Sequence, residues 1–356
     1  MRTVHALATT LTLALAATGC STMGDSGGTA SSAPDGGDAS RVVLLTHDSF
    51  ALPKPLIRRF ERESGADLVV RASGDGGQLT NKLVLTKDDP TGDVAFGVDN
   101  TFASRALDEG VFAPYGAPLP AGAAAYVLPG DDEHRLTPVD NGNVCVNVDT
   151  SWFDDHHVAP PRTLDDLTEP AYRDLFVLPG AATSSTGMAF LLSTVAEYGA
   201  RWPDYWTRLM HDGAKLTAGW SDAYEVDFTR GGGGGDRPIV LSYDSSPAFT
   251  VARGATTSTT RALLDTCFRQ VEYAGVLAGA ANEQGARELV DFLLTPAVQR
   301  ALPESMYVFP VAAHTRLPVD WASYAEQPSD PYSVDPARVA AHRDEWLREW
   351  SDVTSR

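Results

Sequence analysis

The stretch from residue 42 to residue 98 alternates short β-branched runs with helical apolar patterns. Leu56, Ile57 and Phe60 have helical spacing within one charged stretch. An order of strand, helix, strand, helix, strand implies a parallel sheet with helices on both faces. The strands that we predict here are Val42–Thr46, Ala66–Ala72 and Asp93–Val98, with a second helix at Leu79–Leu85.

Polar and glycine-rich loops follow each of these predicted strands. They are His47–Phe50, Gly74–Gly77 and Asp99–Asn100. Ligands of parallel α/β sheets sit at the carboxyl ends of the strands, where such loops converge. The sequence therefore predicts a binding site formed by these loops.

The rest of the chain continues in the same style. Residues 231–235 are a glycine run that we interpret as a surface loop, because no Gly-Lys-Ser/Thr follows to make a phosphate-binding loop. The final helix should bury Val339, Trp346 and Trp350 in one stripe. The further strands predicted are Val144–Val148, Phe176–Pro179, Lys215–Thr217 and Ile239–Ser242, and the further helices are Met188–Tyr198, Glu283–Leu294, Pro296–Leu302 and 336–353.

The first 20 residues have the pattern of an export signal. A short basic start precedes the apolar run Ala6–Ala17, which is too short to span a bilayer well. The run ends in Ala-Thr-Gly-Cys, which resembles a bacterial lipobox, so Cys20 is the predicted site of lipid attachment. Two or more acyl chains give stable anchoring. An ordinary cleaved signal with an incidental cysteine is the simpler alternative.

Residues 21–40 are rich in Ser, Gly, Ala, Thr and Asp, with almost no large apolar side chain. Such a composition cannot form a core, and it suits a flexible tether between the anchor and the folded part. No later stretch is apolar enough to span a membrane, so we expect the folded part outside the bilayer on the extracytoplasmic side.

The formal net charge of −19 argues against a nucleic-acid partner, because phosphates would be repelled. It fits an exported protein and is compatible with a cationic ligand, although solubility alone also explains it. Cys145 and Cys267 remain after the leader cysteine. A pair in an exported protein could form a disulfide, but their distance is not evident from the sequence.

Five stretches carry a resemblance to a known family. They are "THDSF" at 46–50, "FGVDN" at 96–100, "AGWSDAY" at 218–224, "LSYDSSPAF" at 241–249 and "RVAAHRDEWLREW" at 338–350. In this order and spacing the chain resembles the periplasmic thiamine-binding proteins of ABC importers, within the type II solute-binding superfamily that also holds iron(III)- and polyamine-binding proteins. The resemblance extends from Val42 to Arg356.

The resemblance implies an α/β fold of two lobes joined by two crossing hinge strands. Lobe one would comprise residues 41–138 plus 277–356, and lobe two residues 141–273. The crossings would fall near Pro138–Asp140 and Gln270–Tyr273. Both Cys145 and Cys267 would then lie just inside lobe two, which favours a bond between them.

The resemblance also implies ligand contacts from several loops. Trp220 resembles the stacking tryptophan of the family, with a core tryptophan as the alternative. The stretch Tyr243, Asp244, Ser245, Ser246 supplies ring and backbone contacts, although both serines could simply cap a helix before Pro247. Asp75 and Gly76 match a family binding loop.

Further candidates lie at helix starts and at altered aromatic positions. Ser184 and Ser185 precede a helix, where they could hold a phosphate or hydroxyl tail, or only cap the helix. Tyr307 stands where relatives carry tryptophan, and His47 where they carry tyrosine. Asp48 or Asp244 would compensate a positive charge.

Thiamine needs aromatic faces for its thiazolium cation and flat pyrimidine, and donors for its tail. We therefore expect a solute-binding lipoprotein that captures thiamine or a thiamine phosphate and delivers it to an ABC permease. It should act as a monomer, without cofactor, bound metal or chemical reaction.

Rival classes leave partial traces in the sequence. Residues 219–223 loosely mimic a nucleophile elbow, but the final glycine is missing. The pair His156 and His157 beside Asp154 and Asp155 could bind a metal, although solvated surface is the usual outcome. An iron(III)-binding relative would show two adjacent tyrosines, which this chain lacks. A polyamine ligand stays open through Asp48, Asp222 and Asp244.

Overall fold

The computed structural model describes residues 40–252 and 254–355. The predicted signal peptide, the lipobox with Cys20 and nearly all of the tether lie outside these residues. Every helix within the described ranges is too short or too polar to cross a lipid bilayer.

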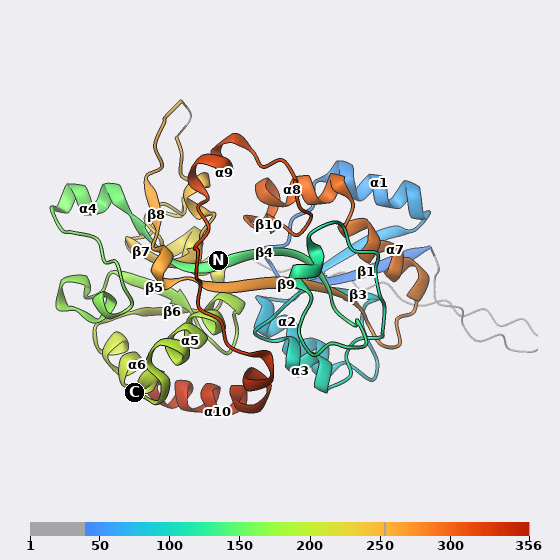
Figure 1. Cartoon of the computed structure of the whole chain (residues 1–356), viewed down its shortest axis with the longest axis horizontal. Coiled ribbons are helices and arrows are strands. Elements are labelled where there is room, and N and C mark those ends of the chain that lie inside the picture. The colour runs from blue at the N-terminus through green and yellow to red at the C-terminus, as the bar shows by residue number, and fades with distance from the viewer. Residues whose placement is uncertain (1–39, 253, 356) are drawn as a thin grey trace, which may run out of the picture. The chain divides into compact units, whose positions relative to one another are not determined.

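Strands and helices alternate along the described chain (Figure 1). The strands are β1 (Arg41–Thr46), β2 (Asp67–Ala72), β3 (Val94–Asp99), β4 (Thr137–Asp149), β5 (Phe176–Pro179), β6 (Lys215–Thr217), β7 (Ile239–Tyr243), β8 (Thr260–Ala262), β9 (Phe268–Val276) and β10 (Phe309–Pro310). The helices are α1 (Lys54–Ser64), α2 (Gly76–Leu85), α3 (Ala103–Asp108), α4 (Thr150–His156), α5 (Ser185–Tyr198), α6 (Trp202–His211), α7 (Glu283–Leu293), α8 (Pro296–Met306), α9 (Val319–Tyr324) and α10 (Pro336–Thr354). Short helical turns lie between them at η1 (Ala123–Tyr126), η2 (Asp165–Thr168), η3 (Pro170–Tyr172), η4 (Gly199–Arg201), η5 (Asp222–Asp227), η6 (Ser246–Phe249) and η7 (Leu264–Thr266).

The predicted parallel unit at the start of the fold is confirmed. Strand β1 pairs in parallel with β2 and with β3. The connections through α1 and α2 are long enough to return the chain in the same direction. Helix α1 ends where Gly65 adopts the left-handed conformation, at φ 74°.

Two long strands run through the middle of the sheet and join its halves (Figure 1). The sheet order is β2-β1-β3-β9-β4-β7-β5-β6, and β9 is antiparallel to both β3 and β4. In their pairing Pro138 faces Tyr273 and Asp140 faces Glu272, which are the positions predicted for the crossings. Strand β4 begins at Thr137 and is therefore longer than the predicted 144–148. All of its residues are buried, including those of its polar first half.

A disulfide links the two crossing strands on one side of the hinge. Cys145 of β4 is bonded to Cys267, which immediately precedes β9. Both cysteines are fully buried. The bond closes a covalent loop around the segment that forms β5 to β8.

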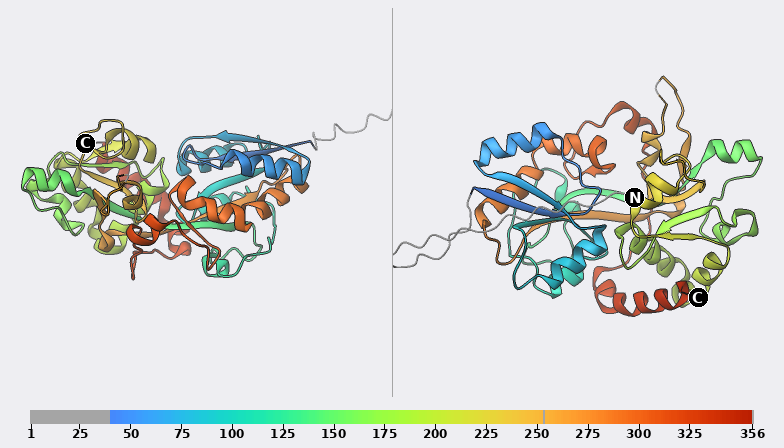
Figure 2. Two further views of the ribbon diagram at one scale, coloured as in Figure 1. Left: turned by 90° about the horizontal axis from the view of Figure 1, so that it is seen from above. Right: turned by 180° about the vertical axis from the view of Figure 1, so that it is seen from behind.

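Helix α10 buries the predicted stripe of Val339, Trp346 and Trp350. The ring of Trp350 packs edge-on against Trp206 of α6, with centroids 5.7 Å apart. The guanidinium of Arg343 lies 4.8 Å from the ring centroid of Phe102. In the right-hand view of Figure 2, α10 (red) runs along the bottom edge of the fold, beside α6. Helix α10 thus packs against α6, within the predicted lobe two, and against Phe102, within the predicted lobe one.

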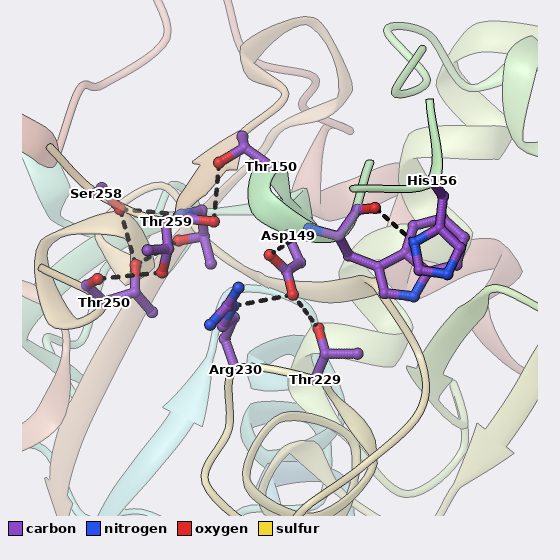
Figure 3. Close-up of polar contacts among 10 residues, drawn as sticks. Asp149, Thr150, His156, Thr229, Arg230, Thr250, Ser258 and Thr259 are labelled. Carbon is purple, nitrogen blue, oxygen red and sulfur yellow. Dashed lines mark hydrogen bonds and ion pairs between the residues drawn. The ribbon is translucent and has the colours of Figure 1, made fainter. Parts of the chain in front are cut away.

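Side-chain hydrogen bonds hold the carboxyl-terminal end of β4 in place (Figure 3). Asp149 caps α4 and accepts hydrogen bonds from Thr229, at 2.7 Å, and from the Arg230 Nε, at 2.9 Å. His156 stacks on Trp152, with centroids 3.8 Å apart, and its Nδ1 lies 2.8 Å from the Trp152 carbonyl. No group of three or more His, Cys, Asp or Glu within the described ranges is placed to hold a metal ion.

Candidate ligand-binding cleft

The amino terminus of α2 is built by a capping box. The carboxylate of Asp75 caps the helix and accepts a hydrogen bond from the Gly76 N–H at 2.6 Å, while the side chain of Gln78 accepts from the Asp75 N–H at 3.1 Å. This arrangement satisfies backbone donors that a helix start leaves free. It also orients the Asp75 carboxylate toward the other half of the sheet.

Asp75 and its neighbours connect α2 to loops far away in the sequence. The Asp75 carboxylate accepts hydrogen bonds from the N–H of Trp220, at 2.8 Å, and from the N–H of Ser185, at 3.2 Å. The Gln78 N–H donates to the Thr183 carbonyl at 3.1 Å. Gly76 is required here, because a Cβ at this position would lie 2.1 Å from the Ser185 Oγ. The loops that carry Thr183, Ser185 and Trp220 therefore contact the start of α2 directly, and we call the region between them the cleft.

Trp220 lies between β6 and η5 and is surrounded by aromatic rings. It stacks on Tyr224 with centroids 5.0 Å apart and an interplanar angle of 11°. The rings of Tyr243 and Tyr307 lie 6.1 and 5.8 Å from it. Its indole N–H donates to the Ser242 Oγ at 2.9 Å. Trp220 is buried and packs in the core, and one part of its ring also lines the cavity described next.

A small cavity lies beside Trp220. Its volume of about 20 Å³ is enough for roughly one water molecule. It is lined by His47, Ser49, Asp75, Ser185, Trp220, Tyr243, Glu272, Met306 and Val308. A second cavity of about 120 Å³ shares Ser49, Asp75 and Trp220 with the first and extends to Asp48 and Asp222.

Acidic groups surround the one imidazole in the first cavity. The Nε2 of His47 lies 3.5 Å from the Glu272 carboxylate. Burial opposes the charged imidazolium, but Glu272, Asp75 and Asp48 outweigh it and raise the pKa of His47. Burial also raises the pKa of Tyr243 well above its ordinary value, so its hydroxyl stays neutral near pH 7. These walls present aromatic faces and negative charge together.

The structure brings Asp75, Ser185, Trp220 and Tyr243 together around this cavity. Gly76 lies beside them at the start of α2. Asp48 lines the second cavity and accepts a hydrogen bond from the Gly74 N–H at 2.9 Å. Tyr307 contacts Trp220 edge-on but stacks on Phe249, with centroids 3.4 Å apart, and does not line the first cavity.

Three further predicted contact residues, Ser184, Ser245 and Ser246, make hydrogen bonds within the fold. Ser184 is fully buried and caps α5, accepting from the Gly187 N–H at 3.4 Å, which is the simpler reading of its position. The Ser245 hydroxyl donates to the Tyr307 carbonyl. The Ser246 hydroxyl lies 2.7 Å from that of Ser242 and accepts from the Tyr243 N–H at 3.1 Å.

Asp244 was predicted as a ligand contact, and it is not among the residues that line the cavity at Trp220. Its carboxylate accepts hydrogen bonds from the Asn143 N–H, at 3.2 Å, and from the Asn143 side chain, at 2.6 Å. It lines a separate cavity with Pro247 and Thr260. Burial raises the pKa of Asp244 to about 6.

Sequence reasoning did not single out Glu272, Met306 or Val308 as contact residues, and it reached Ser49 only as part of the loop His47–Phe50. Glu272 carried a signal that we did not use, since it is a glutamate inside the apolar strand Val271–Val276. A charged residue in a buried strand needs a partner or a function. Met306 and Val308 flank Tyr307 and reach the cavity where that residue does not.

Comparisons with known proteins agree with this geometry. The family model described as bacterial extracellular solute-binding protein matches residues 89–328, more than half of the chain. The chain belongs to this family. The solute-binding fold of two lobes joined by crossing strands, predicted from the resemblance, is thereby confirmed.

Several proteins with curated names are similar to this chain over most of its length. The thiamine-binding periplasmic protein of Escherichia coli (strain K12) is 30% identical over 320 residues, covering 88% of this chain and 94% of that protein. The thiamine-binding periplasmic protein of Brucella suis biovar 1 (strain 1330) is 30% identical, covering 88% and 92%. A solved structure named periplasmic thiamin binding protein superposes with a TM-score of 0.77 at 28% identity, covering 88% and 96%.

Proposed function

We propose that this solute-binding protein captures thiamine or a thiamine phosphate outside the cytoplasm and delivers it to an ABC permease. The observation that carries this proposal is the cavity in which Trp220 and Tyr243 meet the carboxylates of Asp75 and Glu272. Aromatic faces and nearby negative charge suit a flat organic cation. The names of the relatives point to the same ligand.

Ligand entry requires the lobes to move apart. Pockets for molecules of drug size have volumes of about 300–1,000 Å³, whereas the cavity at Trp220 measures about 20 Å³. The lobes would separate about β4 and β9, near Asp140 and Glu272, and the hydrogen bonds of Asp75 would form on closing. A permease would then recognise the closed, loaded state.

Membrane attachment is part of the same proposal. Diacylglycerol on Cys20 would hold the folded body near the permease, and residues 21–40 would supply the reach. Cys20→Ala should move the protein from the membrane fraction to the soluble fraction. Unchanged fractionation would overturn the lipid anchor without touching the ligand assignment.

Titration calorimetry with thiamine, thiamine monophosphate, thiamine diphosphate and spermidine tests the ligand. We expect a thiamine compound to bind more tightly than about 10 μM, or roughly −7 kcal/mol, and spermidine to bind more weakly. Tighter binding of spermidine would make the protein a polyamine carrier. Turnover of the thiamine phosphates would contradict a binding protein and indicate an enzyme.

A pair of tryptophan variants links the binding to the cleft. Trp220→Phe should weaken thiamine binding by about 1 kcal/mol or more, since stacking area is lost. Trp152→Phe is the matched control, because Trp152 stacks on His156 away from the cavity. Equal affinity for both variants would remove Trp220 from the site.

A further inference from the structure

Three carboxylates form a row across neighbouring strands at the hinge. Asp99 of β3 is directly opposite Glu272 of β9, and Glu272 is directly opposite Asp140 of β4. Residues opposite each other in antiparallel strands share one face of the sheet, with adjacent strands about 4.8 Å apart. The three side chains are 0%, 6% and 0% exposed, in the order Asp99, Glu272, Asp140.

The two flanking carboxylates are unevenly supplied with hydrogen-bond donors: the Asp99 Oδ1 accepts from Thr101 and from the Phe102 N–H. Both carboxylate oxygens of Asp140 and the Oδ2 of Asp99 receive no hydrogen bond within the described part of the chain. Burial and the facing Glu272 raise the pKa of Asp140 well above its ordinary value. Burial raises the pKa of Asp99 to about 7. The two flanking acids therefore hold protons that a nearby positive charge would release.

Glu272 is the member of this row that reaches the cavity of Trp220. The charged or titratable groups around it are His47, Asp75, Tyr243 and the two flanking acids. No lysine or arginine is among the residues that line the cavity. The single cationic partner available to Glu272 there is His47, at 3.5 Å.

One polar atom in the same cavity points independently to a ligand. The Ser185 Oγ is buried without a hydrogen-bond partner. Ser185 is 4% exposed and lines the cavity together with Trp220 and Tyr243. A buried hydroxyl of this kind is normally satisfied, so a bound molecule with a polar group would complete it.

We propose that Glu272 is the residue that selects a positively charged ligand group in this cleft, and that the ligand displaces the His47 imidazolium from it. The proposal rests on the proposed thiamine function and adds the residue that recognises the positive charge of the ligand. A cation placed against Glu272 lowers the proton affinity of His47, Asp99 and Asp140 together. Binding should then release protons to solvent.

The test compares thiamine with an analogue in which a neutral thiophene replaces the thiazolium ring. The wild-type protein should prefer thiamine, and Glu272→Gln should weaken thiamine binding by at least about ten-fold while changing analogue binding less than about two-fold. Calorimetry in buffers of different ionisation enthalpy should show proton release in the wild type and much less in the variant. Glu349→Gln, at an exposed position of α10, is the matched control.

His47→Asn provides a second variant in case Glu272→Gln does not fold. Removing the competing imidazolium should tighten thiamine binding at pH 6 and leave analogue binding unchanged. The proposal is overturned if Glu272→Gln weakens both ligands alike, if wild type prefers the neutral analogue, or if His47→Asn weakens both. If wild type binds neither compound, the thiamine function itself fails, and this inference fails with it.

Discussion

The carboxylate of Asp75 accepts a hydrogen bond from the backbone N–H of Trp220, 145 residues further along the chain, at 2.8 Å. The same carboxylate caps α2 and accepts from the N–H of Ser185. One side chain thus starts a helix on one side of the cleft and holds two loops on the other. The strength of these hydrogen bonds should determine how readily the two lobes close.

Replacing Asp75 by Asn should weaken ligand binding more than it weakens the fold. Asn caps helices about as well as Asp, but the neutral amide forms weaker hydrogen bonds to Trp220 and Ser185. We expect thiamine affinity to fall by about 1–2 kcal/mol, measured by calorimetry, with little change in thermal stability. Asp335→Asn, at the cap of α10, is the control and should leave affinity unchanged. Equal affinity in both variants would contradict a closing role for Asp75.

Adding a methyl group at Gly76 should hold the cleft apart. An alanine Cβ would lie 2.1 Å from the Ser185 Oγ and 3.1 Å from the Gly97 carbonyl. Overpacking of this kind costs about 1–3 kcal/mol, so Gly76→Ala should weaken thiamine binding in a titration. The double variant with Ser185→Ala should recover part of the loss. Gly116→Ala, where nothing lies within 4 Å of the added Cβ, should bind as wild type does.

Stability should fall as the pH rises through the range in which Asp99 titrates. Burial raises the pKa of Asp99 to about 7 from an ordinary 3.8. The folded state therefore binds more protons than the unfolded state between these values, and its advantage, at most about 4 kcal/mol, is present below pH 4 and lost by pH 7. Urea unfolding from pH 4 to pH 8 should show this slope, and Asp99→Asn should flatten it. The slope should persist in the exposed-site control Asp132→Asn; an unchanged slope in Asp99→Asn would refute the assignment.

Loss of the Cys145–Cys267 bond should destabilise the fold strongly. The two cysteines are 122 residues apart, so the bond restricts a long loop of the unfolded chain. Such a restriction contributes about 2–5 kcal/mol. Denaturant unfolding of Cys145→Ala/Cys267→Ala should show a loss of this size, and the wild type should lose a similar amount in dithiothreitol. The double variant should be insensitive to dithiothreitol, and a reductant effect in it would point to another cause.

Elements with strong local patterns were predictable from the sequence. The β-branched runs that became β1, β2 and β3, and the stripe of Trp346 and Trp350 on α10, needed only neighbouring residues to be recognised. The first half of β4 was not, because Pro138, Asn141 and Gly142 disfavour a strand locally. Pairing with β9 from more than 100 residues away makes that half a strand.

Part of the candidate site was predictable from local stretches of sequence. Asp75 and Gly76 were predicted because their loop resembles a family binding loop, and Trp220 because it resembles the stacking tryptophan of the family. The sequence did not show that Glu272 reaches this cavity, because the face on which a strand side chain lies depends on strand register. That register is fixed by partners distant in the sequence.

The sequence by itself determined the parallel unit, the apolar stripe of the final helix and the aromatic and acidic residue types available for a ligand, because periodicity acts over a few residues. Tertiary structure decided which of those side chains share a cavity. It aligned Asp99, Glu272 and Asp140 across three strands and placed Asp75 against Trp220. Hydrogen-bond register and lobe contacts join residues more than 100 positions apart, and no local pattern encodes such a meeting.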